Sequence, residues 1–140
     1  MPIVPDDVMY AKASVIERSL RRILEIYHEE PGLNDLLHLD ALTLNAQRAC
    51  QAAIDLAMHA VAAEHLGMPK SQADAFRMLA ENGYLEGALS ERMIGMCGFR
   101  NVLVHQYQEL EIEILHQVAR AGWQDLVSLC QALGLRIVVG

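Results

Sequence analysis

Aromatic residues are scarce in this sequence, and cysteines are few. Phe, Trp and Tyr make up 5% of the 140 residues, whereas hydrophobic residues together make up 53%. A core must therefore be built from Leu, Ile, Val, Ala and Met, a set dominated by good helix formers. The three cysteines are widely spaced and odd in number, which fits neither a disulfide framework nor a zinc site. We expect them to be small buried hydrophobic residues in a reducing compartment.

Long apolar runs and a secretory leader are also missing. No stretch of about 18 apolar residues occurs, and the first residues do not place a basic segment before an apolar one. These features predict a soluble, cytoplasmic protein without a membrane span. A chain of 140 residues is enough for one core without metals or disulfides. We therefore expect a single domain over residues 1–140, and no cofactor.

Positive charge is in deficit. Eighteen acidic residues against eleven basic ones give a formal net charge of −7, the wrong sign for general adhesion to nucleic acid. Any contact with RNA must therefore be local.

Apolar residues recur at helical spacing in five segments. The first runs from the start signal Pro5-Asp6-Asp7 to Glu30, and the second from about Leu36 to Leu66. A short third segment lies between Ser71, which forms a capping-box pattern with Asp74, and Asn82-Gly83. The fourth begins near Leu85, and the fifth spans about Leu110 to Leu133 and ends at Gly134. The pattern predicts an all-α fold, an antiparallel helical bundle of four long helices and one short one.

Small residues mark two of these segments. The second segment carries alanines in its apolar stripe, which would let a neighbouring helix approach closely: Leu39, Leu42, Ala46, Ala49, Ala53, Leu56, Ala60 and Ala63. The fourth contains Gly87, Gly95 and Gly98. Each interior glycine costs a helix about 1 kcal/mol, so these three indicate either close backbone packing or a weak point near the end of the helix.

The stretch from Gly98 to Tyr107 holds several chemically capable side chains close together. Core packing does not require Arg100, Asn101, His105 and Tyr107 in one place. On an ideal helix Arg100 and His105 point about 140° apart, so a single copy of the segment makes a shared site only where the helix ends or distorts. Taken singly, Arg100 also fits a surface ion pair and His105 a cation at a helix C-terminus. Tyr107 also fits a packing residue with a solvated hydroxyl.

This segment resembles the Arg-x4-His-x-Tyr signature of the HEPN superfamily, and in particular its HepT toxins, which are encoded beside a minimal nucleotidyltransferase antitoxin called MntA. The long alanine-rich second helix, the stretch Phe76-Arg77-Met78-Leu79 and the chain length are also similar to that family. The resemblance covers most of the chain, but it is sharp only from Arg100 to Tyr107.

The resemblance implies a homodimer in which the two fourth helices approach and both copies of the motif line one cleft. It implies metal-independent cleavage of RNA, with Arg100 and His105 catalytic and Asn101 assisting. His105 would remove the proton of the ribose 2′-hydroxyl, and Arg100 would hold the phosphate. The resemblance also makes Tyr107 the acceptor of adenylyl groups that the antitoxin transfers from ATP, which would block the site.

Other interpretations remain open at this point. The sequence also fits a non-catalytic helical module that docks a nucleotidyltransferase and is modified by it, or a purely structural dimerisation protein. Asp55 and His59, at positions i and i+4, are expected to form an ordinary helix-surface pair rather than part of a metal site. The cluster Arg18, Arg21 and Arg22 is expected to be a solvated helix face, with contact to RNA or an acidic partner as the alternative.

Overall fold

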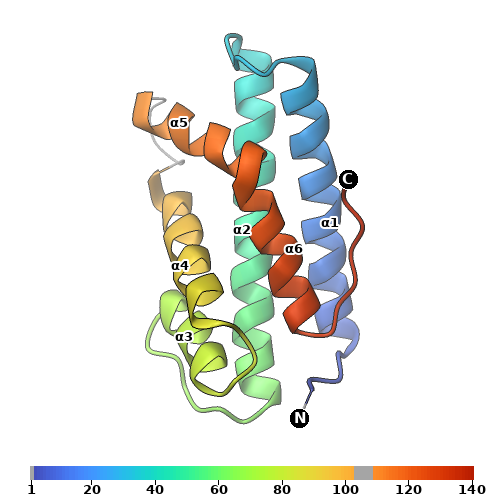
Figure 1. Ribbon diagram of the computed structural model, residues 1–140, viewed down its shortest axis with the longest axis vertical. Helices are drawn as coiled ribbons and strands as arrows, with labels where there is room; N and C mark the ends of the chain where they lie inside the picture. Colours follow the sequence, from blue (N-terminus) through green and yellow to red (C-terminus); the bar gives the residue numbers. More distant parts are fainter. Residues whose placement is uncertain (1, 103–108) are drawn as a thin grey trace.

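The computed structural model describes residues 2–102 and 109–140, with side chains described outside 99–111. All regular elements in these two ranges are helical (Figure 1). In chain order they are α1 (Asp7–Glu29), α2 (Leu36–Ala63), α3 (Gln72–Glu81), α4 (Gly87–Val102), α5 (Glu109–Gln117), the π-helical turn η1 (Val118–Gly122) and α6 (Trp123–Ala132). The predicted all-α bundle is confirmed.

Local capping groups set the helix starts. The side chain of Asp6 accepts a hydrogen bond from Met9 N at 3.0 Å and begins α1. Ser71 Oγ accepts one from Asp74 N at 3.1 Å and begins α3, as its sequence pattern predicts. The carboxylate of Asp74 accepts from Lys70 N at 2.9 Å, one residue before the cap. Asp6 and Ser71 thus supply hydrogen-bond acceptors to amides of the first turn, which have no carbonyl partner within the helix.

The alanine stripe of α2 is buried as predicted, except for Ala63 at the end of the helix. Ala49, Ala53 and Ala60 are fully buried, and Ala46 nearly so. Small side chains let α1, α4 and α6 pack around α2 (Figure 1). The three cysteines are also buried and free of disulfides, as expected.

The predicted fifth helix from Leu110 to Leu133 is not continuous. A π-helical turn at Val118–Gly122 separates α5 from α6, and the two segments run in different directions (Figure 1). The methyl carbon of Met96, on α4, lies 3.2 Å from where a Cβ on Gly122 would be. Met96 of α4 therefore lies against the turn at Gly122. A π-helical turn can bend a helix that contains no proline.

The C-terminal residues run back along α1 (Figure 1). Gly134, with φ of 82°, ends α6 in the left-handed conformation that glycine adopts readily. Leu135 and Ile137 are then buried, and Val138 exchanges two hydrogen bonds with α1, one from its N to Glu17 Oε2 and one from Arg21 Nε to its O. The tail therefore covers one side of the bundle.

Candidate functional site

The predicted site segment is only partly within the described residues. Arg100 and Asn101 belong to the last turn of α4, which is helical to Val102, but their side chains are outside the described part. His105 and Tyr107, and with them the predicted departure from helix near Val104 to Tyr107, lie outside the described residues. The described part of the site consists of the elements that lead into the segment and out of it.

Helix α4 is fixed against α2 just before the segment. The Cys50 thiol lies 3.9 Å from the carbonyl oxygen of Met96, and the Cys97 thiol lies 3.9 Å from the carbonyl oxygen of Cys50. Since thiols are weak donors, these contacts mainly report close packing of the two backbones. They place the last turns of α4 beside α2.

A second attachment joins α4 to α6. Arg92 Nε lies 3.1 Å from Asp125 Oδ1, and the Asp125 side chain is only 22% exposed. Because Arg92 itself is half exposed, we regard this pair as a positional contact rather than a large source of stability. Together with the cysteine contacts it sets the direction in which α4 ends.

On the other side of the segment, α5 and η1 are anchored to α1. Tyr27 Oη lies 2.6 Å from His116 Nδ1, and the two rings meet edge to face with centroids 5.5 Å apart. The guanidinium of Arg120 lies over the Tyr27 ring at 5.9 Å. The chain on both sides of residues 103–108 is thus held by side-chain contacts with other helices.

The glycines of α4 do not pack closely inside the protomer. A Cβ built on Gly87, Gly95 or Gly98 meets no described atom within 4 Å. Gly95 and Gly98 are exposed. Of the two explanations that the sequence offers, close packing is therefore wrong for contacts within the described chain, and the glycine surface of α4 is open.

A family model described as HepT-like, for ribonucleases of the HepT type, matches residues 16–133 of the chain. The chain belongs to the HepT-like ribonuclease family. The resemblance that rests on Arg100 to Tyr107 is thereby confirmed at the level of the family.

Individual HepT-like relatives agree over nearly the whole chain. The mRNA nuclease HepT of Shewanella oneidensis is 36% identical over 121 residues, which cover 86% of this chain and 91% of that protein. A crystal structure of a toxin–antitoxin complex with AMP-PNP matches with a TM-score of 0.86 at 32% identity, covering 92% of this chain and 98% of that one. The tri-AMPylated HEPN toxin of Shewanella oneidensis, in complex with its MNT antitoxin, matches with a TM-score of 0.85 at 33% identity, covering 93% and 98%.

One sequence prediction outside the HepT-like motif concerns two residues of α2. Asp55 and His59 do not pair with each other, so that prediction was wrong. Asp55 Oδ2 binds Lys12 Nζ at 3.1 Å, and His59 Nε2 lies 2.6 Å from Asp6 Oδ2, so both residues connect α2 to α1. The hydrogen bond from His59, followed by that from the Met9 amide, lowers the pKa of Asp6 below its usual 3.8.

Metal-binding clusters and membrane-spanning helices are both absent from the described residues. Within residues 2–102 and 109–140, no three His, Cys, Asp or Glu side chains are grouped so that they could hold a metal ion. None of the helices in these ranges combines the length and apolar character needed to span a bilayer.

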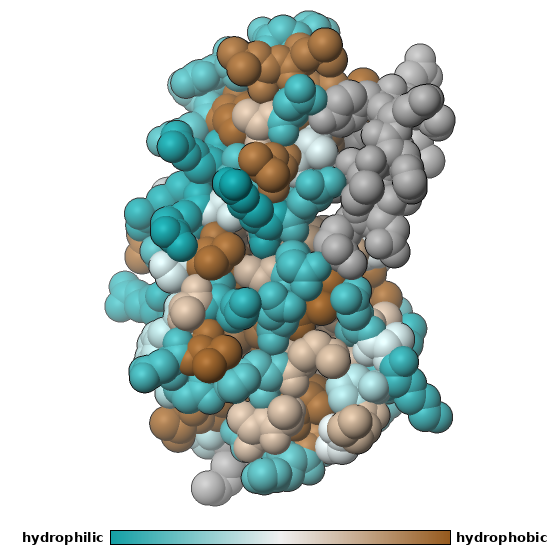
Figure 2. All heavy atoms as spheres, turned by 180° about the vertical axis from the view of Figure 1, so that it is seen from behind, coloured by the Kyte–Doolittle hydropathy of each residue, from teal (hydrophilic) through white to brown (hydrophobic). Residues whose placement is uncertain are grey.

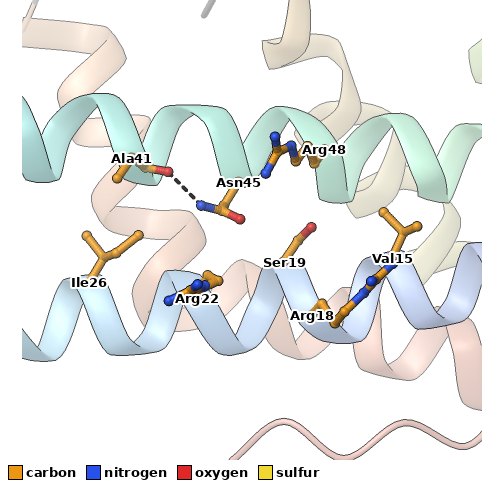
Figure 3. Close-up of a pocket in the computed structure, with 8 residues that line it drawn as sticks. All are labelled: Val15, Arg18, Ser19, Arg22, Ile26, Ala41, Asn45 and Arg48. Carbon is orange, nitrogen blue, oxygen red and sulfur yellow. Dashed lines mark hydrogen bonds between the residues drawn. The ribbon is translucent and has the colours of Figure 1, made fainter.

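The arginine cluster of α1 divides into two parts. Arg21 turns to the C-terminal tail, whereas Arg18 and Arg22 line a groove between α1 and α2 with Arg48 (Figure 3). All three arginines are exposed, as expected for a solvated helix face. The spacing of Arg18 and Arg22 at i and i+4 already placed them on one face, but nothing in the sequence pointed to Arg48.

Proposed function

We propose that the chain is the RNA-cleaving toxin of a toxin–antitoxin pair. The observation that carries the proposal is the likeness to the mRNA nuclease HepT of Shewanella oneidensis over 86% of this chain. The chain also holds Arg100, Asn101, His105 and Tyr107 at the spacing of the HEPN signature. The likeness to toxins crystallised with their antitoxin supports a nucleotidyltransferase as the partner.

The proposed cleavage needs no metal, because RNA carries its own nucleophile. His105 removes the proton from the 2′-hydroxyl, and the 2′ oxygen forms a bond to phosphorus as the bond from phosphorus to the 5′ oxygen breaks. A proton is delivered to the leaving 5′ oxygen by His105 of a second copy. The products are a 2′,3′-cyclic phosphate and a free 5′-hydroxyl. Arg100 offsets the charge on the phosphate oxygens, and Asn101 orients the imidazole or the phosphate.

A second copy of the chain explains the geometry of the motif. Arg100 and His105 point about 140° apart on an ideal helix, so two copies of α4 that approach each other supply complementary groups to one cleft. The open surface at Gly95 and Gly98 supports this arrangement, since a second helix can approach a backbone that has no side chains in the way. We therefore propose a homodimer with a composite site.

Tyr107 is the proposed regulatory residue. Its phenol oxygen attacks the α-phosphorus of ATP on the antitoxin, a bond forms between that oxygen and phosphorus, and pyrophosphate leaves. The adenylyl phosphodiester then occupies Arg100 and repels the RNA backbone. The tri-AMPylated state of the Shewanella oneidensis toxin supports this modification.

The first test measures cleavage by the purified, unmodified protein in the presence of EDTA. We expect RNA fragments with cyclic phosphate ends, and a loss of at least 100-fold for His105→Ala, the scale on which general acid–base groups act. His28→Ala is the matched control, because His28 is an exposed histidine at the end of α1. Cleavage by His105→Ala at the wild-type rate would remove His105 from the mechanism.

The second test separates the enzyme from a module that is only modified. Expression without the antitoxin should stop growth for the wild type and not for His105→Ala, whereas a non-catalytic module would be harmless in both forms. Co-expression with the antitoxin should add adenylyl mass to the wild type and none to Tyr107→Phe. Equal adenylylation of Tyr107→Phe would place the modification on another residue.

A further inference from the structure

A groove lies between α1 and α2, on the face opposite α6. It has a volume of about 730 Å³, within the range of ligand-binding clefts. Arg18 and Arg22 come from α1 and Arg48 from α2, with Ser19 and Asn45 between them (Figure 3). Seen from behind, this side of the molecule carries hydrophilic side chains over most of its area, with smaller hydrophobic patches between them (Figure 2).

The three arginines of this groove are poorly neutralised. Arg18 and Arg48 have no acidic partner among the described residues, and Arg22 touches only Glu25, at 3.4 Å with both side chains well exposed. By contrast, Lys12 is paired with Asp55 and Arg92 with Asp125. Three guanidinium groups around one groove therefore form a local positive site on a chain of net charge −7.

The floor of the groove offers hydrogen bonds as well as charge. Ser19 is 4% exposed, its hydroxyl points toward α2 (Figure 3), and no hydrogen bond to it is made within the described chain. Asn45 is 9% exposed, and its Nδ2 donates to Ala41 O at 2.9 Å, which fixes the orientation of the amide. The Ser19 hydroxyl lines the groove next to the arginines. A hydroxyl donor beside guanidinium groups is suited to an anion with several acceptor oxygens.

The groove is at the same level of the bundle as the end of α4. The contacts of Cys50 with Met96 and Cys97 fix the register of α2 and α4, which run antiparallel (Figure 1). With a rise of about 1.5 Å per residue, Arg48 is about 3 Å before Cys50, and the backbone of Arg100 is about 4.5 Å beyond Cys97 in the same direction. The width of α2, about 10 Å, separates the two places.

We propose that the groove of Arg18, Arg22 and Arg48 binds the phosphate backbone of single-stranded RNA outside the bond that is cut. The inference rests on the proposed ribonuclease function and adds a binding site on another face of α2. A strand held there crosses the exposed side of α2 and continues to the end of α4. This continuity favours RNA over an acidic protein surface, because the substrate must extend past the cut bond.

The test measures RNA binding without cleavage. His105→Ala protein is titrated into a fluorescently labelled single-stranded RNA of mixed sequence, and anisotropy gives Kd over a series of salt concentrations. Adding Arg18→Ala, Arg22→Ala and Arg48→Ala should weaken binding at least tenfold at low salt. Each lost phosphate contact lowers the slope of log K against log salt by about 0.7, so the slope should fall by about 2.

A matched control removes three positive charges elsewhere. Lys70, Arg77 and Arg136 are exposed and lie outside the groove, so their triple alanine variant should change Kd less than threefold. If the groove triple variant does not fold, as judged by circular dichroism, Arg48→Gln alone keeps a polar helix former in place and should still weaken binding severalfold. Inorganic phosphate and AMP, tested as competitors, show whether the groove prefers a free phosphate to a strand.

The outcomes separate the two proposals. Wild-type protein that cleaves RNA, together with a groove variant that binds RNA as tightly as the control, would overturn the groove and leave the ribonuclease. Absence of cleavage by the wild type would overturn the ribonuclease itself. Loss of antitoxin binding in the groove variant, with RNA binding unchanged, would assign the groove to a protein partner and overturn the RNA proposal.

Discussion

Gly95 in the middle of α4 allows a test of what its open surface is for. A Cβ at this position meets no described atom within 4 Å, and the residue is exposed. Glycine in a helix interior is less favourable than alanine by about 1 kcal/mol, and the gain from Gly→Ala at a compatible site is about 0.4–1 kcal/mol. Since an added methyl group at Gly95 would clash with no described atom, we expect Gly95→Ala to raise the free energy of unfolding of the protomer by about 0.5–1 kcal/mol.

Urea denaturation followed by far-UV circular dichroism measures this gain, with an accompanying rise in Tm of roughly 2–5 °C. Gly122→Ala is the internal comparison. A Cβ at Gly122 would be 3.2 Å from the Met96 methyl carbon, so that side chain must move aside and the gain should be smaller. A destabilised Gly95→Ala protein, measured where the chain is monomeric, would refute the open-space argument.

Adding Gly98→Ala to this variant tests the proposed dimer. If two copies of α4 meet at Gly95 and Gly98, added methyl groups hold the helices apart, and the dimer of Gly95→Ala/Gly98→Ala should dissociate at higher concentration than the wild type. Sedimentation equilibrium over a dilution series measures this. A more stable protomer with a weaker dimer is the combination we expect. An unchanged dimer would show that these glycines do not line the interface.

Three further predictions concern contacts away from α4. Tyr27→Phe removes the hydroxyl 2.6 Å from His116 Nδ1, and urea denaturation should show a loss of about 1 kcal/mol. Cys130 should resist iodoacetamide at about pH 8 unless the protein is unfolded, because burial raises its pKa to about 12 and little thiolate forms; rapid alkylation of folded protein would contradict this. Hydrogen bonding to Asp35 raises the pKa of His38 above 6.5, so its stabilisation is present below pH 6.5 and is lost as the pH rises through the folded pKa. Urea titrations across this range should show a flatter pH dependence for His38→Ala, and an unchanged slope would count against the contact.

Local interactions account for most of what the sequence predicted correctly. The starts of α1 and α3 depend on Asp6 and Ser71, whose side chains bond to amides three residues ahead. The end of α6 depends on the positive φ of Gly134. These signals act within a few residues, so they can be read without knowing the rest of the fold.

The errors arose where a distant helix supplies the partner. Asp55 and His59 have the spacing of a pair on one helix. In the structure, however, Asp55 binds Lys12 of α1. His59 binds Asp6, the residue that caps α1. The spacing rule describes isolated helices, where a neighbour four residues away is the nearest charge. At the π-helical turn Val118–Gly122, Gly122 likewise lies against Met96 of α4, a contact that the apolar periodicity of the fifth segment does not contain.

The candidate site likewise has features that neighbouring residues predict and features that depend on the packing of distant helices. The sequence by itself determined the helical class, the caps and the motif from Arg100 to Tyr107, because periodicity, turn chemistry and residue spacing are properties of neighbouring residues. Only the tertiary structure decided that Arg48 joins Arg18 and Arg22, although Arg48 and Arg22 are on different helices, and that the α4 glycines are open. The physical reason is that such groups meet through the packing of two helices, whose register depends on the core of the whole bundle rather than on either helix alone.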